Sequence, residues 1–251
     1  MDEPLAGLDR LSKDEILPHL EALHTALSIP ILYVSHDLAE VERLADHLVL
    51  LEAGRVVASG SLQDLQADPA LPVARLPEAA VVLTATVARY DPAYGLTTLS
   101  VEGGTIIATG QYGAPGTPQR VRVVASDVSL ARQPPGPSTI LNTLAARVAG
   151  ADPQDAAQVN VVVRLGAAGL GARLLARVTR KSWEALGTRP GDLVHVQVKS
   201  VALVSAGGTA LGRTVGPPSS STRRQQAAVT SDSGSSHEDQ RAQPLKLARN
   251  P

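Results

Sequence analysis

Hydrophobic positions in the first part of the chain recur at helical spacing. Between residues 12 and 28 they fall at Ile16, Leu17, Leu20, Leu23 and Leu27, one side of a helix. Ser12, with Glu15 three residues later, predicts a capped helix start. Pro18 is expected to kink this helix or to move its start. A second, shorter helix is predicted over residues 37–45, DLAEVERLA.

Three apolar runs in the same part of the chain have the composition of strands. Residues 29–35, IPILYVS, predict a strand buried on both faces. Residues 46–52, DHLVLLE, predict another strand, and 53–60, AGRVVASG, its return partner in a hairpin that turns near Gly54. The alternation of strands and helices predicts an α/β unit over residues 1–68.

The pattern changes after a proline-rich stretch at residues 69–80, which we interpret as a linker. Short β-type runs follow, and they form a loose repeat. Residues 84–91 resemble 144–152, and residues 122–131 resemble 196–205. We therefore predict two related small β-barrels in tandem, at residues 81–132 and 138–206.

The spacing of the two repeats predicts one extra element in the second. Val148 lies 61 positions after Val87, whereas Ser200 lies 74 positions after Ser126. The difference matches TRKSWEALGTRPG, a helical stretch that only the second copy contains. Residues 207–251 are poor in hydrophobic residues and rich in Ser, Gln, Gly and Pro, so we expect this tail to be disordered.

Composition narrows the classes of function. The formal net charge is −1, so the chain has no strong electrostatic field that would favour binding to nucleic acid or anionic lipid. The chain contains no cysteine, which excludes disulfides and thiolate metal sites. The longest apolar runs fall short of the ~20 residues that a membrane span needs, and no basic region precedes an apolar stretch at the start. These features predict an intracellular protein.

Polar residues follow two of the predicted strands. Asp2 and Glu3 stand where a strand would end, and His36 follows residues 29–35 in the motif SHD. Adjacent carboxylates suit phosphoryl transfer, because one can hold Mg²⁺ through water while the next orients the attacking water. A histidine at the end of a neighbouring parallel strand would face the same cleft.

The sequence MDEPLAGLD followed by ILYVSHD resembles the second half of an ABC-transporter nucleotide-binding domain, a P-loop NTPase. The resemblance implies the C-terminal portion of an α/β ABC ATPase that uses ATP and Mg²⁺. It makes Asp2 the Walker B aspartate, which holds Mg²⁺ through water, and Glu3 the catalytic glutamate. It also makes Asp9 the D-loop aspartate that reaches across a homodimer, and His36 the switch histidine that contacts the γ-phosphate.

The printed sequence has no G-x-x-x-x-G-K-[S/T] motif and no ABC signature motif. We therefore expect a truncated product or a gene begun at an internal methionine. Because the P-loop carries most of the triphosphate binding, we expect the chain to be inactive as an ATPase alone. We also expect its strands to leave apolar edges exposed.

The β-rich region resembles the tandem regulatory domain of molybdate-importer ATPase subunits, built of two TOBE or Mop-like modules with OB-like small barrels. The resemblance rests on residues 125–148, 176–192 and 194–204. It implies a molybdate-binding pocket formed by polar groups at Ser138, Thr139, Asn142 and Lys199. Small Mop proteins carry an arginine where this chain has Leu141, which leaves the pocket poorer in charge.

A structural role for the same polar residues stays open, with Ser138 and Thr139 capping a turn and Lys199 exposed on a strand. Taken together, the resemblances imply the ATPase subunit of a molybdate importer. It would lie in the cytoplasm at the inner face of the membrane, and would work with permease subunits and, indirectly, with a periplasmic or extracellular molybdate-binding protein. The alternatives are a non-enzymatic oxyanion-binding dimer and the ATPase of a sugar or sulfate importer.

Overall fold

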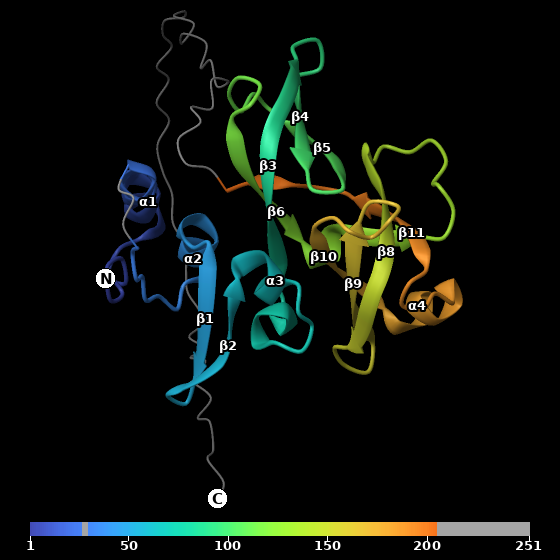
Figure 1. The fold of residues 1–251 in the computed structure, drawn as a ribbon, viewed down its shortest axis with the longest axis horizontal. Helices are drawn as coiled ribbons and strands as arrows, with labels where there is room; N and C mark the ends of the chain where they lie inside the picture. The colour runs from blue at the N-terminus through green and yellow to red at the C-terminus, as the bar shows by residue number, and fades with distance from the viewer. Residues whose placement is uncertain (27–29, 205–251) are drawn as a thin grey trace, which may run out of the picture. The chain divides into compact units, whose positions relative to one another are not determined.

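A computed structural model describes residues 1–26 and 30–204 (Figure 1). The elements of the first part are α1 (Arg10–Ala26), α2 (Leu38–Leu44), β1 (His47–Glu52), β2 (Arg55–Ser61), α3 (Leu62–Gln66) and the 3₁₀ turn η1 (Pro72–Arg75). The predicted tail at residues 207–251 and the first residue of the predicted strand at 29–35 lie outside the described ranges.

The remaining elements are almost all strands. They are β3 (Ala80–Asp91), β4 (Leu96–Val101), β5 (Gly104–Thr109), β6 (Pro118–Val124), η2 (Ala125–Asp127), β7 (Val128–Ala131), β8 (Asn142–Pro153), β9 (Gln158–Leu165), β10 (Arg173–Thr179), α4 (Arg180–Leu186), β11 (Leu193–Val198) and β12 (Ala202–Leu203). The predicted helix of the second repeat is confirmed as α4.

The start of α1 differs from the prediction. The helix begins at Arg10, and the Oδ1 of Asp9 accepts a hydrogen bond from the Ser12 backbone N–H at 2.8 Å. Ser12 is therefore inside the helix and is not its cap, because an aspartate three residues earlier takes that role. Pro18 lies within the helix, which continues to Ala26. In the part of the chain that the structure describes, no helix is long and apolar enough to cross a bilayer.

The buried strand predicted for residues 29–35 is wrong for the described residues 30–35. Only an isolated parallel bridge between Val34 and Asp2 is present. Leu32 is 79% exposed and Val34 44% exposed. An apolar run forms a buried strand only where other strands or helices cover both of its faces, and this segment pairs only with residues 1–3.

The predicted hairpin is confirmed. β1 and β2 pair antiparallel, and the turn between them uses Ala53 and Gly54, with φ values of 48° and 74°. Two consecutive left-handed residues are typical of a tight hairpin turn, and glycine adopts this conformation without strain.

The β-rich region forms two five-stranded antiparallel sheets with matching strand order, β12-β6-β3-β4-β5 and β7-β11-β8-β9-β10. The predicted repeat is confirmed in detail by a bulge. The register of β3 on β4 shifts between Val87 and Arg89, and that of β8 on β9 shifts between Val148 and Gly150. The two bulges are 61 positions apart, the spacing of the repeat.

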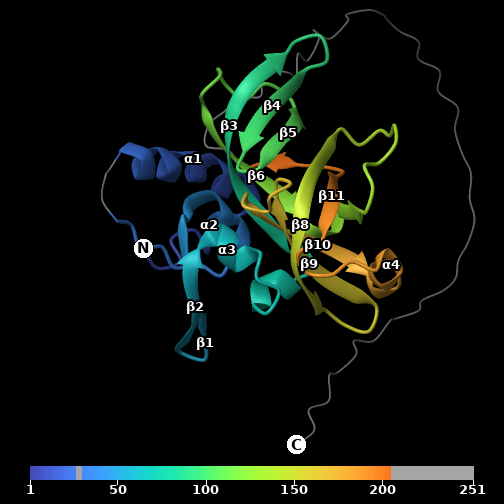
Figure 2. The ribbon, with the colours of Figure 1, turned by 45° about the vertical axis from the view of Figure 1, so that its right-hand side comes forward.

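The two sheets exchange their edge strands. β7, which the repeat comparison groups with β3–β6, pairs with β11, whereas β12 pairs with β6. Figure 1 shows the chain after β11 (orange) crossing to β6, and Figure 2 shows the same crossing from another side. At the crossing, the Lys199 N–H donates to the Asp127 carbonyl at 2.9 Å, and the Ser200 hydroxyl donates to the Asp127 carboxylate. Each sheet is therefore completed by the other repeat.

One arginine of β6 joins the β region to the end of α2. The Arg120 guanidinium donates to the carbonyl oxygens of Glu42, Arg43 and Ala45 at 3.2, 3.0 and 2.8 Å, and pairs with the Asp46 carboxylate. A cation at the C-terminal end of a helix satisfies carbonyls that have no partner inside it and complements the helix dipole.

A second arginine of β6 holds the side of α2. The Nε of Arg122 donates to the buried Glu42 carboxylate at 2.7 Å, and the Gln66 side chain donates to the same carboxylate at 3.1 Å. Burial raises the pKa of Glu42, and the nearby Arg122 charge offsets part of that rise. The two arginines therefore fix α2 against the β region from two directions.

The hydrophobic core belongs almost entirely to the β region. All of its buried members except Ala67 and Ala74 lie between Ala79 and Val198. In contrast, the first part of the chain exposes large apolar side chains, such as Leu11 at 78% and Leu51 at 66%. The free energy of folding of the described residues therefore comes chiefly from residues 79–198.

Substitutions in the two parts should differ in cost. Leu83 on β3 is fully buried, whereas Leu51 on β1 is 66% exposed. We expect Leu83→Ala to lower the free energy of unfolding by about 2–5 kcal/mol through the cavity that it leaves. Leu51→Ala, the matched control, should change it by less than about 0.5 kcal/mol. Urea denaturation followed by circular dichroism measures both; equal losses would contradict a core confined to the β region.

Candidate functional site

The backbone at the start of the chain runs beside residues 32–34. The Met1 amino group donates a hydrogen bond to the Leu32 carbonyl oxygen at 2.8 Å. The Val34 N–H donates to the Met1 carbonyl oxygen, and the Glu3 N–H donates to the Val34 carbonyl oxygen, both at 2.9 Å. Because the two segments run parallel, the acidic motif that ends at Glu3 and the SHD motif lie at the same end of the pairing. It therefore places the residue after Asp2 next to the loop that carries His36.

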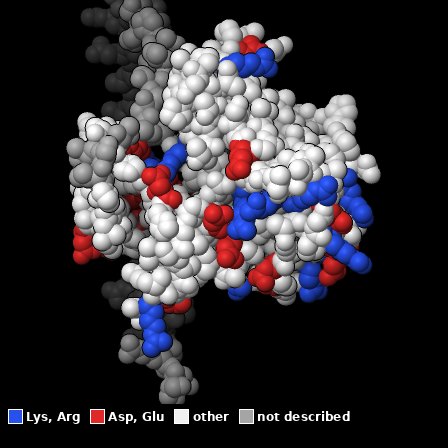
Figure 3. All heavy atoms as spheres, in the orientation of Figure 1, with Lys and Arg blue, Asp and Glu red and all other residues white. Residues whose placement is uncertain are grey.

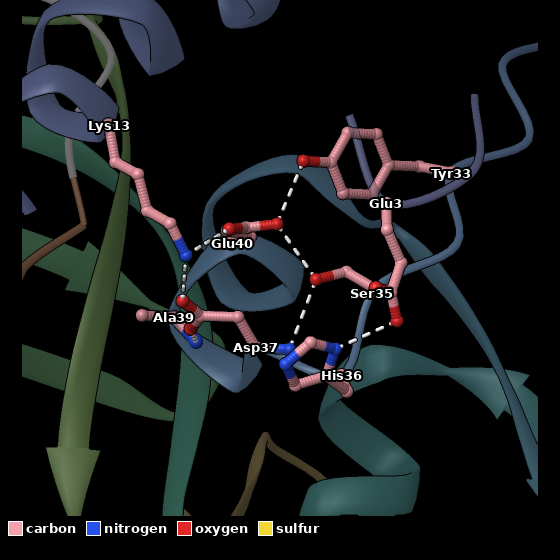
Figure 4. A network of polar contacts seen from close by, with 8 residues as sticks. All are labelled: Glu3, Lys13, Tyr33, Ser35, His36, Asp37, Ala39 and Glu40. Carbon is pink, nitrogen blue, oxygen red and sulfur yellow. Dashed lines mark hydrogen bonds and ion pairs between the residues drawn. The ribbon is translucent and has the colours of Figure 1, made fainter. Parts of the chain in front are cut away.

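Glu3 and His36 are in direct contact. The Glu3 Oε1 and the His36 Nδ1 are 2.8 Å apart, with side chains that are 45% and 77% exposed. Figure 4 shows the two side chains pointing toward each other from different segments. Glu3 has a φ of 41°, in the left-handed region that costs a residue with a side chain some backbone strain. The sequence prediction that these two residues share a site fits this arrangement.

Behind this pair lies a buried carboxylate. Glu40, on the first turn of α2, is 3% exposed at its side chain and pairs with the Lys13 Nζ at 2.7 Å. Lys13 also pairs with the Asp37 carboxylate at 2.7 Å. On its other side, Glu40 accepts hydrogen bonds from the Tyr33 and Ser35 hydroxyls at 2.8 and 2.7 Å (Figure 4). The network therefore ties α1, α2 and residues 33–37 together.

The charges of this network are mutually stabilised. Burial alone would raise the pKa of Glu40, but the hydrogen bonds from Lys13, Ser35 and Tyr33 outweigh it and lower that pKa. The hydrogen bond from Lys13 is the largest cause of the lowered pKa of Asp37. The same two carboxylates raise the pKa of Lys13. The ionised forms of all three groups are thus favoured.

The start of α2 is fixed by its own cap. The Asp37 Oδ1 accepts from the Ala39 N–H at 2.9 Å, and the Ser35 hydroxyl accepts from the Asp37 N–H at 3.0 Å. Because His36 lies between these two capping residues, its backbone position is set by the helix start. Sequence reasoning missed Glu40, because an acid on a short polar helix has the pattern of a solvent-exposed residue.

Asp2 and Asp9 lie on either side of Glu3 in the chain. Asp2 is exposed, and its side chain forms no hydrogen bond within the described ranges. Asp9 caps α1, and the hydrogen bond from the Ser12 backbone N–H is the largest cause of its lowered pKa. Among the described residues, no group of three or more His, Cys, Asp or Glu could hold a metal ion by itself.

A small cavity lies between Glu3, His36, Ser35 and the Lys13 network. Its volume is about 30 Å³. A cavity of this size has room for water and is far smaller than a site for a nucleotide. The arrangement can therefore hold a water molecule beside an exposed carboxylate and an imidazole.

The four residues predicted to bind an oxyanion lie at one end of the β8–β11 pair. Val198 is paired with Asn142, so Lys199 and the residues before β8 extend from the same end of this ladder. Ser138, Thr139 and Lys199 are exposed, and the Ser138 hydroxyl accepts from the Ile140 N–H at 3.2 Å.

The side chain of Asn142 has a different environment from the other three. Asn142 is 7% exposed. Its side-chain oxygen accepts from the Ile107 N–H at 2.6 Å, and its side-chain nitrogen donates to the Ile107 carbonyl at 3.0 Å. Both polar atoms of the amide thus serve the contact between β8 and β5, and the sequence alone gives no sign of this use.

A comparison with protein-family profiles matches part of the β region. The profile of the TOBE domain family matches residues 138–204, which span the second repeat and the exchanged strand β12. The matched residues include β8, β9, β10 and β11 of the second sheet and β12 of the first.

A comparison with individual protein sequences finds relatives that match most of the chain. The molybdenum import ATP-binding protein ModC of Rhodopseudomonas palustris (strain HaA2) is 53% identical over 210 residues, which are 84% of this chain and 56% of that protein. ModC of Rhodobacter capsulatus is 54% identical over 203 residues, or 81% of this chain and 56% of that protein. Over the matched residues the chain is therefore a homologue of the molybdenum import ATP-binding proteins. It spans a little over half the length of these relatives.

One solved structure is similar to part of this chain at a low level. The cytoplasmic molybdate-binding protein ModG, crystallised with molybdate bound, has a TM-score of 0.43 and 21% identity. The match covers 49% of this chain and 93% of that chain.

The Glu40 network predicts a pH-dependent loss of stability in Glu40→Gln. Because the pKa of Glu40 is lowered on folding, its contribution is full above its ordinary pKa of 4.5 and is lost as the pH falls through the lower, folded value. At pH 7 the substitution should cost about 1–3 kcal/mol, since it weakens hydrogen bonds to a charged group. The difference from the parent protein should shrink below about pH 4.

Urea denaturation at a series of pH values, followed by circular dichroism, measures this difference. Glu15→Gln serves as the control, because Glu15 is exposed on α1 and outside the network. A difference that is the same at pH 7 and pH 3 would contradict the assignment of a buried carboxylate.

Proposed function

We propose that residues 1–68 carry the Walker B, D-loop and H-loop part of an ABC-type ATPase, and that the chain serves in an importer of molybdate driven by ATP hydrolysis. The observation that carries this proposal is the 2.8 Å contact between Glu3 and His36, which joins two motifs 33 positions apart. The similarity to the ModC proteins, which continues through both parts of the chain, supports it.

In this proposal Glu3 is the residue that orients and activates the attacking water. Its carboxylate is exposed toward the small cavity, and a carboxylate in this position can accept a proton from water. His36 donates to or accepts from Glu3 through Nδ1, which leaves Nε2 free to contact a phosphate oxygen. The Asp37 cap and the Glu40 network hold the imidazole in place.

This role requires ATP and Mg²⁺, and the described residues offer an exposed carboxylate for the metal ion. ATP supplies the phosphoryl group and Mg²⁺ neutralises its charge. Mg²⁺ prefers oxygen ligands and keeps several waters, and the exposed carboxylate of Asp2 suits a contact through water. In a homodimer, Asp9 would face the second subunit. Its hydrogen bond from the Ser12 backbone N–H fixes the start of α1.

For the β region we propose a regulatory role in which it binds the transported oxyanion. Ser138, Thr139 and Lys199 are exposed at one end of the β8–β11 ladder, and hydroxyls with a single cation are suitable donors for a tetrahedral anion. Asn142 positions this end of β8 through its bonds to Ile107. Binding would slow import when molybdate is abundant.

The working protein would lie on the cytoplasmic side of the cell membrane against permease subunits, with a molybdate-binding protein on the other side delivering the anion. A second candidate is a non-enzymatic oxyanion-binding dimer. It is favoured by one observation, the confinement of the hydrophobic core to residues 67–198. A sulfate or sugar importer is a further alternative for the transported compound.

The catalytic role can be tested in a chimera. We would replace the matching segment of the R. palustris ModC protein with residues 1–204 of this chain and measure ATP hydrolysis. Glu3→Gln should lower the rate by about 100-fold or more, because it removes the general base, whereas Glu15→Gln on the exposed side of α1 should leave it unchanged. An active chimera that tolerates Glu3→Gln would refute the assigned role.

Oxyanion binding can be tested separately on the full chain. Calorimetric titration with molybdate, with sulfate as the comparison, should show saturable binding that weakens about tenfold in Lys199→Gln, since a charge-assisted hydrogen bond is lost. Lys181→Gln, an exposed lysine on α4, is the matched control. Binding without an active chimera would favour the non-enzymatic dimer; no binding by the folded chain would exclude the regulatory role.

A further inference from the structure

Three arginines stand in register across neighbouring strands of the second sheet. Arg147 on β8 is paired with Arg164 on β9, and Arg164 is paired with Arg173 on β10. Directly paired residues of an antiparallel sheet point to the same face. The residues beside them, such as Leu165 and Leu174, are fully buried on the other face. The three guanidinium groups therefore form a row on the outer face of the sheet.

This row carries more positive charge than the surrounding side chains neutralise. Arg173 lies 3.6 Å from the Asp64 carboxylate, and its Nε is buried with no hydrogen-bond partner in the described ranges. Arg164 has no ion pair or hydrogen bond from its side chain to any described residue. Arg147 donates to two backbone carbonyl oxygens, each at 2.7 Å. Like charges directly opposite on neighbouring strands destabilise a sheet, so the row favours a bound anion.

The surface view agrees with this arrangement. Figure 3 shows Lys and Arg side chains in a band over β10, β9 and β8, with acidic side chains near its α3 end. Neighbouring strands are about 4.8 Å apart, so the outer two arginines are separated by about 10 Å at the backbone. A single tetrahedral anion can contact two neighbouring guanidinium groups, whereas a chain of linked phosphates can reach all three.

We propose that Arg147, Arg164 and Arg173 form a binding site for a linear phosphate-type polyanion. Guanidinium groups suit this ligand, because they keep their positive charge and donate charge-assisted N–H hydrogen bonds to phosphate oxygens. The site differs from the proposed molybdate pocket: Arg147 lies five residues along β8 from Asn142, about 17 Å away. The inference does not depend on the proposed transport function.

Titration of the full chain with three probes tests this site. Orthophosphate, pyrophosphate and tripolyphosphate are added in a buffer free of other multivalent anions, and binding is followed by calorimetry and by the thermal midpoint. Affinity should rise from orthophosphate to tripolyphosphate. In Arg164→Gln, the affinity for tripolyphosphate should fall about tenfold or more, because a charge-assisted contact is lost.

The same variant also separates binding from folding. Without a probe, Arg164→Gln should unfold at a higher temperature than the parent chain, because the repulsion in the row is relieved. Arg89→Gln on β3, an exposed strand arginine paired with Thr98, should keep the parent affinity.

Three results of the binding measurements would overturn the proposal. They are no saturable tripolyphosphate binding by the parent chain, unchanged binding in Arg164→Gln, and an equal loss in Arg89→Gln. A lowered thermal midpoint of Arg164→Gln in the probe-free buffer would also count against it. Molybdate titration of this variant should match the parent, which keeps this result separate from the test of Lys199.

Discussion

The exchange of β7 and β12 is the constraint on which the β region depends. Each repeat supplies four strands of its own sheet and the edge strand of the other. The buried residues of both repeats consequently form one core, which extends from Ala79 to Val198 apart from two alanines of the preceding segment. Neither repeat can lose its last strand without exposing the edge of its partner, so the two sheets are stable only together.

The sequence was most informative where a pattern is local. Gly54 predicted the hairpin turn because left-handed backbone at this site needs no tertiary support, and the 61-position repeat reappears in the paired bulges after Val87 and Val148. Glu3 and His36 were expected to face one cleft and are in contact, although an isolated bridge stands where the strand before His36 was predicted. Residues 30–35 were misjudged because burial depends on neighbours that a local pattern does not reveal. The exchange of β7 was missed because either sheet could accept the strand.

The same residue types can serve binding or structure, and only the contacts decide between them. Asn142 has the composition of an anion ligand, yet both of its polar side-chain atoms bond to the Ile107 backbone. Glu40 has the pattern of a surface acid, yet it is the buried centre of a network behind Glu3 and His36. Both side chains hold the backbone beside a candidate site, an effect that motif spacing alone cannot report.

The contacts of Arg120 and Arg122 with α2 have a thermodynamic consequence. A helix of seven residues is too short to be stable alone, and Arg120 of β6 donates hydrogen bonds to the carbonyl oxygens at its C-terminal end. Part of the free energy that orders residues 38–44 is thus supplied by the β region. Such linkage is reciprocal. A ligand that orders the loop around His36 through α2 therefore stabilises the β6 edge by the coupling free energy between the two sites. The same edge is hydrogen-bonded to β12.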